Sequence, residues 1–504
     1  MVKNVAVIGA GISGLAAIKS CLEEDLEPTC FERSDDIGGL WRFTDNVEDG
    51  RASIYKSLVT NASKELMCLS DFPMPEDFPN FLPHQKFFEY CRMYAEHFKL
   101  LKYIRFKTKT NGKTETTIFD AVMICTGQHE QPVFPLDSFS GIKKFKGQIM
   151  HCREYKRPVG FDEKQVLIVG MGNTGVDIAT ELCTKAAKVY LSTKAGVWVI
   201  RRLGQDGYPW DLSFITRFNS WIRTIAPPSI VRWLLKKYMN DQFDHSFYGI
   251  QPEGIVWKEP LVNEELPSRL LSGTIVIKPG VKEFTETSVC FKNGARIDNL
   301  DVVIFATGYQ FSFPFLEESV INVDDSKGFL YKKVIPVGLQ KPTLAFIGLI
   351  LSVGPVMVAA ELQCRWATRL FKGFIKMPTA KEMNQDLARD EQLRYKWFAT
   401  AKDNSRQTEY TMYMDDLALQ IGMFLTDPVL ATKVLFGPCN SYQYRLTGPG
   451  KWLGAREAIL TQWERIKKPL LTRVAEDDSH LPLTLHVRWF FWFVILLGAV
   501  WIMA

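Results

Sequence analysis

A glycine-rich turn near the start of the chain is the part of the sequence best suited to bind a dinucleotide. The turn runs from Gly9 to Gly14 (GAGISG), and Glu32 follows it by about twenty residues. Its first glycine makes the bend, its second lets backbone approach a pyrophosphate, and its third lets helix and strand pack closely. The phosphates would lie on free N–H groups at the helix start. We therefore predict a dinucleotide site in which the Glu32 carboxylate accepts a hydrogen bond from a ribose hydroxyl and disfavours a nucleotide with a 2′-phosphate.

A second turn of the same kind runs from Gly170 to Gly175 (GMGNTG). The strand that follows its helix ends in Ser192-Thr193-Lys194 instead of an acid, and two arginines, Arg201 and Arg202, come soon after. Hydroxyls and a cation can receive a 2′-phosphate where a carboxylate would repel it. The alternative is that Lys194 is a solvated side chain at a strand end. The two turns together predict an FAD-like nucleotide in the first site and NADPH in the second.

Two further loops carry residues that could act on a bound cofactor. Gly38-Gly39-Leu40-Trp41 places two glycines before an aromatic ring, which lets the loop approach a ligand and cover it. The polar stretch from Tyr55 to Glu65 contains Asn61. An asparagine in a loop is usually turn chemistry, so the pattern alone assigns Asn61 no function.

Apolar patterning supplies the elements that must position these turns. We expect strands at Asn4–Ile8, Pro28–Phe31, Phe119–Cys125, Gln165–Val169, Lys188–Leu191 and Asp301–Ala306, and helices at Leu15–Glu24, Phe87–Phe98, Val176–Cys183 and Leu212–Met239. The strands at 119–125 and 301–306 both end in Thr-Gly. As a pair they suggest that the chain leaves its first domain near residue 130 and returns near 310.

The expected fold is therefore α/β, with two Rossmann-like dinucleotide-binding domains and the second inserted in the first. We divide the chain into an FAD-binding domain (1–144 and 310–470), an NADPH-binding domain (145–309) with a helical insertion at about 208–300, and a C-terminal membrane-anchoring helix at 486–504. The run 343–358 is broken by glycines and a proline, so we expect a strand and a buried helix there and no membrane span.

Composition excludes several other classes. The 504 residues are 46% apolar and 23% charged, as in ordinary globular proteins, and the net charge of +5 gives no case for nucleic acid. Ten scattered cysteines show no metal-ligand spacing, so we expect reduced thiols in the cytosol and no metal site. The chain enters its first strand directly, without a recognisable signal peptide.

The C-terminal stretch from Trp489 to Ala504 is uncharged and bordered by tryptophan. It is slightly short of the roughly 20 residues that span a bilayer, and a buried core helix is the alternative. Basic residues upstream favour a tail anchor with the bulk of the protein on the cytosolic side. The stretch 212–239 alternates Trp, Arg and Lys with aliphatic residues, which fits either an interfacial membrane face or a packed helix with a solvated basic face.

On the basis of these motifs, the chain resembles the vertebrate flavin-containing monooxygenases (dimethylaniline monooxygenases) over nearly its full length. Beyond the two glycine turns, the Gly39-Leu40-Trp41 loop and the apolar C-terminus, the diagnostic match is Phe145, Gly147, His151, Tyr155 and Pro158. These residues fit the sequence that identifies the family and separates it from other two-dinucleotide flavoproteins.

The resemblance implies an NADPH- and O₂-dependent flavoprotein that forms a C4a-hydroperoxyflavin and oxygenates soft nucleophiles, such as tertiary amines and thioethers, to N-oxides and S-oxides. It implies a location on the endoplasmic reticulum membrane. Asn61 is then the catalytic amide beside the flavin, Asn173 is a second pocket amide, and His151 orders the inter-domain loop. The expected cofactor contacts are Gly9, Ala10, Gly11, Ile12, Ser13, Gly14, Glu32, Gly39, Leu40, Trp41, Thr60, Asn61, Ala62, Gly170, Gly172, Asn173, Thr174, Gly175, Val176, Asp177, Ser192, Thr193 and Lys194.

The chain departs from the family pattern in three places. It is short by about a hairpin between Phe106 and Asn111, it lacks part of a loop near 422–424, and it has Leu351 where many relatives have a polar residue. Losing sheet edge exposes backbone groups that need cover, which bears on FAD retention. Two other readings stay open: ketone oxygenation of Baeyer–Villiger type, and an uncoupled or inactive membrane flavoprotein. Neither the substrates nor the oligomeric state follows from the sequence.

Overall fold

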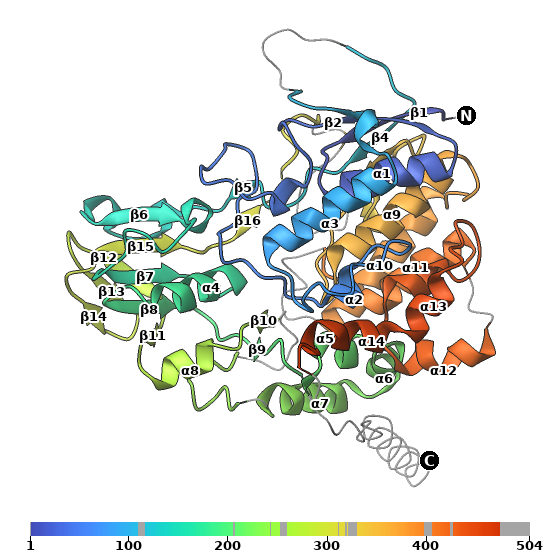
Figure 1. The fold of residues 1–504 in the computed structure, drawn as a ribbon. Helices are drawn as coiled ribbons and strands as arrows, with labels where there is room; N and C mark the ends of the chain where they lie inside the picture. Colours follow the sequence, from blue (N-terminus) through green and yellow to red (C-terminus); the bar gives the residue numbers. More distant parts are fainter. Residues whose placement is uncertain are drawn as a thin grey trace.

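The structure is a computed structural model that describes residues 2–108, 116–204, 207–241, 243–252, 260–310, 312–317, 320, 330–397, 406–423 and 427–473 (Figure 1). Its strands are β1 Asn4–Ile8, β2 Glu27–Phe31, β3 Ile104–Arg105, β4 Ala121–Ile124, β5 Gln131–Pro132, β6 Gln148–His151, β7 Gln165–Val169, β8 Lys188–Ser192, β9 Val199–Ile200, β10 Leu261–Val262, β11 Ile275–Lys278, β12 Val281–Phe284, β13 Val289–Phe291, β14 Arg296–Ile297, β15 Val302–Phe305, β16 Tyr309–Gln310, β17 Leu330–Tyr331, β18 Ile335–Pro336 and β19 Leu344–Phe346. Its helices are α1 Ile12–Glu23, α2 Lys64–Met67, α3 His84–His97, α4 Asn173–Leu182, α5 Trp210–Phe214, α6 Arg217–Ile225, α7 Pro228–Asn240, α8 Leu266–Leu271, α9 Val356–Phe371, α10 Ala380–Trp397, α11 Tyr410–Ile421, α12 Pro428–Phe436, α13 Ala455–Leu460 and α14 Gln462–Lys467.

The first sheet is parallel and carries the first glycine turn. Its strand order is β19-β4-β1-β2-β3, so β1 lies at the centre with β2 and β4 on either side. Val5 and Val7 in β1 are fully buried, as expected for a strand covered on both faces. Helix α1 packs on this sheet and against α9. The loops that follow these strands therefore meet at one edge, where ligands of open α/β sheets bind.

The second sheet is also parallel and carries the second glycine turn. Its order is β11-β8-β7-β15-β6, and Figure 1 shows it with α4 at the left of the view, away from α1 and α9. Strands β12, β13 and β14 form a small antiparallel sheet beside it. Both parallel sheets agree with the sequence prediction of two dinucleotide-binding units. The exact domain limits that we drew from the sequence remain predictions.

A short two-stranded ladder marks where the chain passes between the two sheets. Strand β5 leaves the first unit, strand β16 returns from the second, and the two pair antiparallel. The chain then re-enters the first sheet as β19. The segment between β5 and β16 is thus the part of the chain that builds the second sheet.

Helices α5 to α7 pack with the first unit, although they lie within the segment that builds the second sheet. Trp210, Leu212 and Phe214 of α5 belong to the same buried core as α1 and α9. Helix α6 contacts α11 and α12, and Figure 1 shows these helices below the first unit, next to the C-terminal helices. The insertion therefore joins the two units as well as extending the second.

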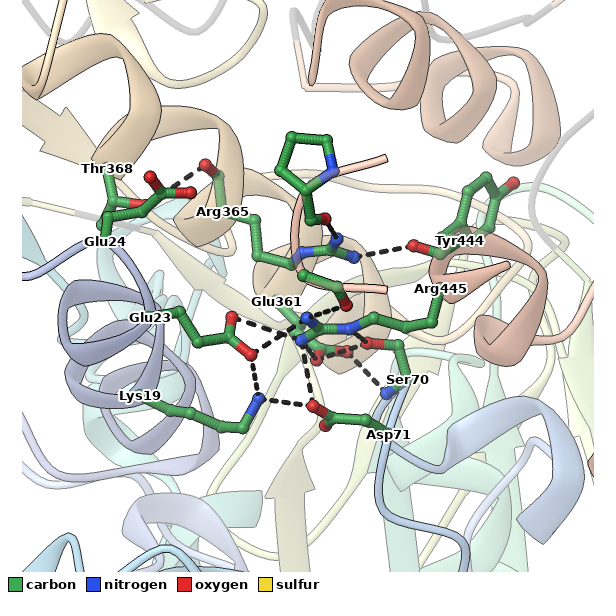
Figure 2. A network of polar contacts seen from close by, with 12 residues as sticks. Lys19, Glu23, Glu24, Ser70, Asp71, Glu361, Arg365, Thr368, Tyr444 and Arg445 are labelled. Carbon is green, nitrogen blue, oxygen red and sulfur yellow. Dashed lines mark hydrogen bonds and ion pairs between the residues drawn. The ribbon is translucent and has the colours of Figure 1, made fainter. Parts of the chain in front are cut away.

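A buried arginine fastens the C-terminal segment to the first unit (Figure 2). The Arg445 guanidinium donates to Glu23 Oε1 of α1 at 2.9 Å and to Ser70 Oγ at 2.7 Å, and it lies 3.2 Å from Glu361 Oε1 of α9. Arg445 is 1% exposed. The Arg445 guanidinium therefore links α1, α9 and the loop that contains Ser70. Its positive charge also offsets the two carboxylates, Glu23 and Glu361, that this packing brings close together.

Further charges complete this network. The Lys19 ammonium lies 2.6 Å from both Glu23 Oε1 and Asp71 Oδ2. Burial raises the pKa of the Glu23 carboxyl, but Arg445 and Lys19 outweigh burial and lower that pKa to about 2. Arg365 donates to the backbone carbonyl of Tyr444 at 2.9 Å. The network fixes α1, whose first turn is the glycine turn, against the C-terminal segment.

Candidate functional site

The first glycine turn has the geometry that a pyrophosphate requires. Gly9 has φ +101°, and a Cβ there would lie 2.7 Å from the carbonyl oxygen of Cys125. A Cβ at Gly14 would lie 1.9 Å from the carbonyl oxygen of Gly9. No residue with a side chain fits at either position, so the tight bend and the close helix–strand packing both depend on glycine.

The second loop of the first unit lies directly against this turn. The backbone N–H of Gly38 donates to the carbonyl of Ala10 at 3.0 Å. A Cβ at Gly11 would meet only the Cα of Gly39, at 3.7 Å, among the described residues. Facing glycines thus leave a backbone-lined cradle that a Cβ would begin to fill. Trp41 lies beside it with its ring centroid 4.4 Å from that of Phe87. The cradle fits the pyrophosphate of FAD.

Glu32 stands at the end of β2, beside the first turn. One carboxylate oxygen accepts from the backbone N–H of Ala10 at 2.7 Å, and the other accepts from Ser34 N and Oγ at 2.8 Å. These bonds fix the carboxylate at the rim of the cradle, where sequence reasoning places a ribose. The ribose contact itself remains a prediction.

The second glycine turn repeats this geometry around strand β15. Gly170 has φ +115°, and a Cβ there would lie 2.3 Å from the carbonyl oxygen of Ala306. A Cβ at Gly175 would lie 2.3 Å from the carbonyl oxygen of Gly170, whereas Gly172 has no described atom within 4 Å of that position. Gly172 is therefore not required by packing within the protein, as expected where a ligand's phosphates approach the backbone.

Side chains in the first turns of α4 are already engaged with neighbouring segments. Asn173 Oδ1 accepts from the backbone N–H of Val262 at 2.9 Å. Asp177 accepts from Tyr55 Oη at 2.5 Å and from Asn263 Nδ2 at 3.0 Å. Burial raises the pKa of the Asp177 carboxyl. These residues position the helix and its neighbours, so a direct cofactor contact by Asn173 or Asp177 is still a prediction.

The strand end predicted to receive a 2′-phosphate offers fewer free groups than expected. Ser192 is 2% exposed and its hydroxyl donates to the carbonyl of Pro279 at 2.8 Å. The Thr193 hydroxyl donates to the carbonyl of Ala195. Lys194 is exposed. Both hydroxyls are thus used within the loop. The Lys194 ammonium lies 5.9 Å from the ring centroid of Phe139 and forms no hydrogen bond with a described residue.

Asn61 lies in a loop that is hydrogen-bonded to segment 202–211. Arg202 Nη2 donates to Asn61 Oδ1 at 3.0 Å, and Arg202 Nε donates to the Thr60 carbonyl at 3.1 Å. Trp210 Nε1 donates to the Asn61 carbonyl at 3.3 Å. In the sequence Arg202 follows soon after the strand end predicted to receive a 2′-phosphate, but the structure places its side chain against Asn61. No local signal joins Asn61 to Arg202, because 141 residues separate them.

Arg202 determines which end of the Asn61 amide can bind a ligand. Asn61 Oδ1 accepts from Arg202, and Asn61 Nδ2 forms no hydrogen bond with any described residue. Arg202 is itself held by Glu264 at 2.9 Å. The half-buried amide therefore keeps two N–H donors for a ligand.

Neighbours of Asn61 lock the same loop. The Thr60 hydroxyl donates to the Ala62 carbonyl at 3.0 Å. The backbone N–H of Ser63 donates to Asp211 Oδ2 at 2.6 Å, and burial raises the pKa of the Asp211 carboxyl to about 6. Sequence reasoning missed Asp211, which is fully buried. It joins the loop to α5.

The loop before Asn61 is tied to α4. Ser57 and Tyr155 both donate to Glu181 Oε2 at 2.8 Å, and Tyr55 donates to Asp177 as described above. The Asn61 loop is therefore fixed to the helix of the second glycine turn, and the two predicted cofactor sites share one wall.

His151 ends β6 beneath the ladder that joins the two units. Its Nδ1 accepts from the backbone N–H of Arg153 at 3.2 Å, and its ring meets Tyr309 edge-on at 5.4 Å. Burial lowers the pKa of the imidazole to about 4, so His151 is neutral near pH 7. These contacts fit the ordering role that we assigned to it.

Leu351 lies between β19 and α9 in the first unit. Its backbone N–H donates to the Arg406 carbonyl at 3.0 Å, and its carbonyl accepts from Thr408 at 3.0 Å. Its side chain is half-buried. Of the other two departures, Asn111 and Phe424 lie outside the described residues.

The membrane predictions fall partly outside the described part of the chain. Segment 486–504 lies outside it altogether. Within the ranges that the structure describes, no helix is long and apolar enough to cross a membrane. The same residues contain no group of three or more His, Cys, Asp or Glu side chains arranged to hold a metal ion.

Comparisons with known proteins agree with this geometry. The sequence pattern of the flavin-binding monooxygenase-like family matches residues 2–504. The chain is 51% identical over 517 residues to the rat dimethylaniline monooxygenase [N-oxide-forming] 2, covering 97% of each. Among solved structures it resembles the S-allyl-L-cysteine S-oxygenase of Allium sativum (TM-score 0.63, 23% identity, 93% of this chain and 99% of that one). It also resembles the NADP⁺-bound cyclohexanone monooxygenase of Rhodococcus sp. Phi1 (TM-score 0.61, 15% identity, 84% and 98%).

Proposed function

The chain belongs to the flavin-binding monooxygenase-like family, and on that premise we propose how its own residues carry the reaction. It is an oxidoreductase, a flavin-containing monooxygenase that uses FAD and NADPH. Its reaction transfers one oxygen atom of O₂ to a soft nucleophile. The assignment of residue roles rests on one observation. Arg202 donates to Asn61 Oδ1, so both N–H groups of the Asn61 amide are without a partner among the described residues.

Two backbone cradles hold the cofactors in this proposal. Gly11 and Gly39, at the first turn of α1, would hold the pyrophosphate of FAD, and Glu32 would accept from its ribose. Gly172, at the first turn of α4, would receive the phosphates of NADPH. When bound, the flavin accepts hydride from NADPH and supplies the activated oxygen.

The Asn61 loop forms the wall between the two cofactors. It is tied to α4 through Tyr55 and Asp177 and to α5 through Asp211. From this wall the Asn61 N–H groups would donate hydrogen bonds to oxygen at the edge of a bound flavin. An amide donates hydrogen bonds without giving up a proton, so it supports the oxygen without promoting release of peroxide. Arg202 is a positioning residue, because it acts by orienting that amide.

We propose small, soft nucleophiles as substrates, namely tertiary amines and thioethers, which give N-oxides and S-oxides. The relatives support this class: one is named for N-oxide formation and one solved structure is an S-oxygenase. The fold alone does not separate this from ketone oxygenation, since cyclohexanone monooxygenase shares it.

The experiment that tests the proposal measures coupling. The full chain in membranes is given FAD, NADPH and a thioether, and sulfoxide, hydrogen peroxide and NADPH consumption are measured together. We expect sulfoxide equal to the NADPH consumed. Ester formation from a methyl ketone, with no sulfoxide, would instead indicate Baeyer–Villiger chemistry. NADPH consumed with only peroxide formed would indicate an uncoupled flavoprotein, and no bound flavin would indicate an inactive one.

We further propose that helices α6 and α7 lie on a lipid surface, with segment 486–504 as the anchor and the catalytic part on the cytosolic side of the endoplasmic reticulum. Trp221 and Trp233 are 50% and 59% exposed. Ile225, Ile230 and Leu234 are exposed beside them, as are Lys236 and Lys237. Aromatic and aliphatic side chains next to lysines suit an anionic interface.

Replacing Trp221 or Trp233 by Phe tests this surface. In vesicles whose acyl chains carry bromine, bromine quenches indoles that lie at the bilayer. We expect either replacement to remove part of the quenched tryptophan fluorescence. Trp452→Phe, at a partly buried tryptophan packed on the core, is the matched control and should leave the quenched fraction unchanged. Quenching that is identical in all three variants would contradict the proposed surface.

A further inference from the structure

Three lysines gather where strands β8 and β11 end. Lys278 is the last residue of β11 and lies in register with Ser192 of β8. Lys194 follows β8, and Lys292 follows β13. Among the described residues no carboxylate pairs with any of the three, whereas Lys146 in the same unit pairs with Glu286.

The half-buried ammonium of Lys278 lies near two aromatic rings. Its Nζ is 5.9 Å from the ring centroid of Tyr190 and 5.8 Å from that of Phe291. Each ring attracts the cation weakly, which orients the side chain without using its three N–H donors. Lys278 is thus a pre-positioned cation whose ammonium forms no hydrogen bond with any residue that the structure describes.

Lys194 and Lys292 converge on the same place from two loops. Both run past Gly280: a Cβ at that glycine would lie 3.2 Å from Lys194 Cγ and 3.7 Å from Lys292 Cε. The backbone of Lys292 is fixed there, since its N–H donates to the Gly280 carbonyl at 3.0 Å. The three side chains carry the same charge at neighbouring positions, and no acid among the described residues pairs with them, so their charges repel one another. A bound anion would remove that repulsion.

The anion that this place would receive follows from its position. It is the strand end after the second glycine turn, where the adenosine ribose of a dinucleotide lies. The Ser192 and Thr193 hydroxyls are already committed to backbone carbonyls. Recognition of a phosphate on that ribose must therefore come from cations.

We propose that Lys278 and Lys292 act with Lys194 to bind the 2′-phosphate of NADPH and so set the preference for NADPH over NADH. The inference rests on the proposed function, which places NADPH on α4, and it adds two residues to the single lysine that the sequence suggested. Arg202, one of the two arginines that follow this strand end in the sequence, is engaged with Asn61 and Glu264 instead.

Binding of small probes to the full detergent-solubilised chain tests the proposal without turnover. Titration calorimetry would compare 2′-AMP, 5′-AMP and inorganic phosphate. We expect Lys278→Met to weaken 2′-AMP binding about tenfold, the loss of one charged hydrogen bond, and Lys292→Ala to weaken it about threefold. Binding of 5′-AMP should not change in either variant. Lys282→Ala, at an exposed lysine of the neighbouring strand β12, is the matched control and should change neither.

Several outcomes would overturn the proposal. Equal weakening of 2′-AMP and 5′-AMP would mean that the lysines support the nucleotide fold and not the phosphate. Inorganic phosphate binding as tightly as 2′-AMP would mean an unspecific anion patch. If Lys278→Met lowers stability, Lys278→Arg keeps the charge and must keep the 2′-AMP preference. A chain that binds 2′-AMP through these lysines but oxygenates nothing would refute the proposed function and leave this inference standing.

Discussion

Replacing Asn61 by Asp should lower the rate of sulfoxide formation about 10²- to 10³-fold, the cost of removing a preorganised donor at a site of developing negative charge. The carboxylate has nearly the same shape and can still accept from Arg202, which donates to Asn61 Oδ1 at 3.0 Å. It has no N–H to offer, and its charge repels a negatively charged oxygen. NADPH should still be consumed, with hydrogen peroxide as the product.

The measurement is the ratio of sulfoxide and of peroxide to NADPH consumed, at saturating FAD. Asn46→Asp makes the same chemical change at an exposed position and should retain full coupling. Coupling above half of the wild-type value in Asn61→Asp would show that the amide donors are not needed. A loss of bound FAD in the variant would point to the loop and not to the reaction, so flavin content is measured alongside.

Replacing Arg445 by Met should destabilise the first unit by about 3–5 kcal/mol, the cost of leaving a buried charge without its partner. Met has a similar length and fills the space, so the expected loss is electrostatic. Glu23 and Glu361 would each lose a guanidinium contact, and Ser70 Oγ would lose its donor. Urea denaturation at pH 7 measures the loss.

A pH comparison separates the charge effect from lost packing. In the unaltered chain the pKa of Glu23 is lowered to about 2, so its stabilising contribution is complete at pH 5 and pH 7 and is lost only as the pH falls from about 4.5 towards 2. Without Arg445 the pKa of Glu23 rises, and protonation at pH 5 relieves part of the penalty. The destabilisation should therefore be smaller at pH 5 than at pH 7.

The matched control is Arg456→Met. Arg456 pairs with Asp427 at 3.2 Å, and its side chain is 52% exposed, so the expected loss is at most about 1 kcal/mol. A loss in Arg445→Met that is the same at both pH values would contradict the electrostatic account.

The sequence alone determined the two cofactor cradles. Strand, glycine turn and helix are contiguous, and the positive φ of Gly9 and Gly170 belongs to the bend itself, although the carbonyls that a Cβ would meet there, those of Cys125 and Ala306, come from distant strands. The sequence also identified the family, because the match runs over almost the whole chain. The central strands of both sheets and the helices after each glycine turn lie where apolar patterning predicted, within a few residues. The single helix predicted at 212–239 was wrong: the structure divides it into α5, α6 and α7, and α7 begins at Pro228, which cannot continue a helix from the residues before it.

Tertiary structure decided what surrounds the reacting centre. Arg202 contacts Asn61 instead of a 2′-phosphate, and Asp211 holds the same loop from α5. These partners are more than 140 residues apart in the sequence, and local patterns carry no information on which distant side chain a loop will meet. The Ser192 hydroxyl is a suitable phosphate donor by type, but its burial against Pro279 commits it elsewhere. Residue type and spacing thus specify where a cofactor can lie, whereas the availability of each polar group depends on partners that only folding brings together.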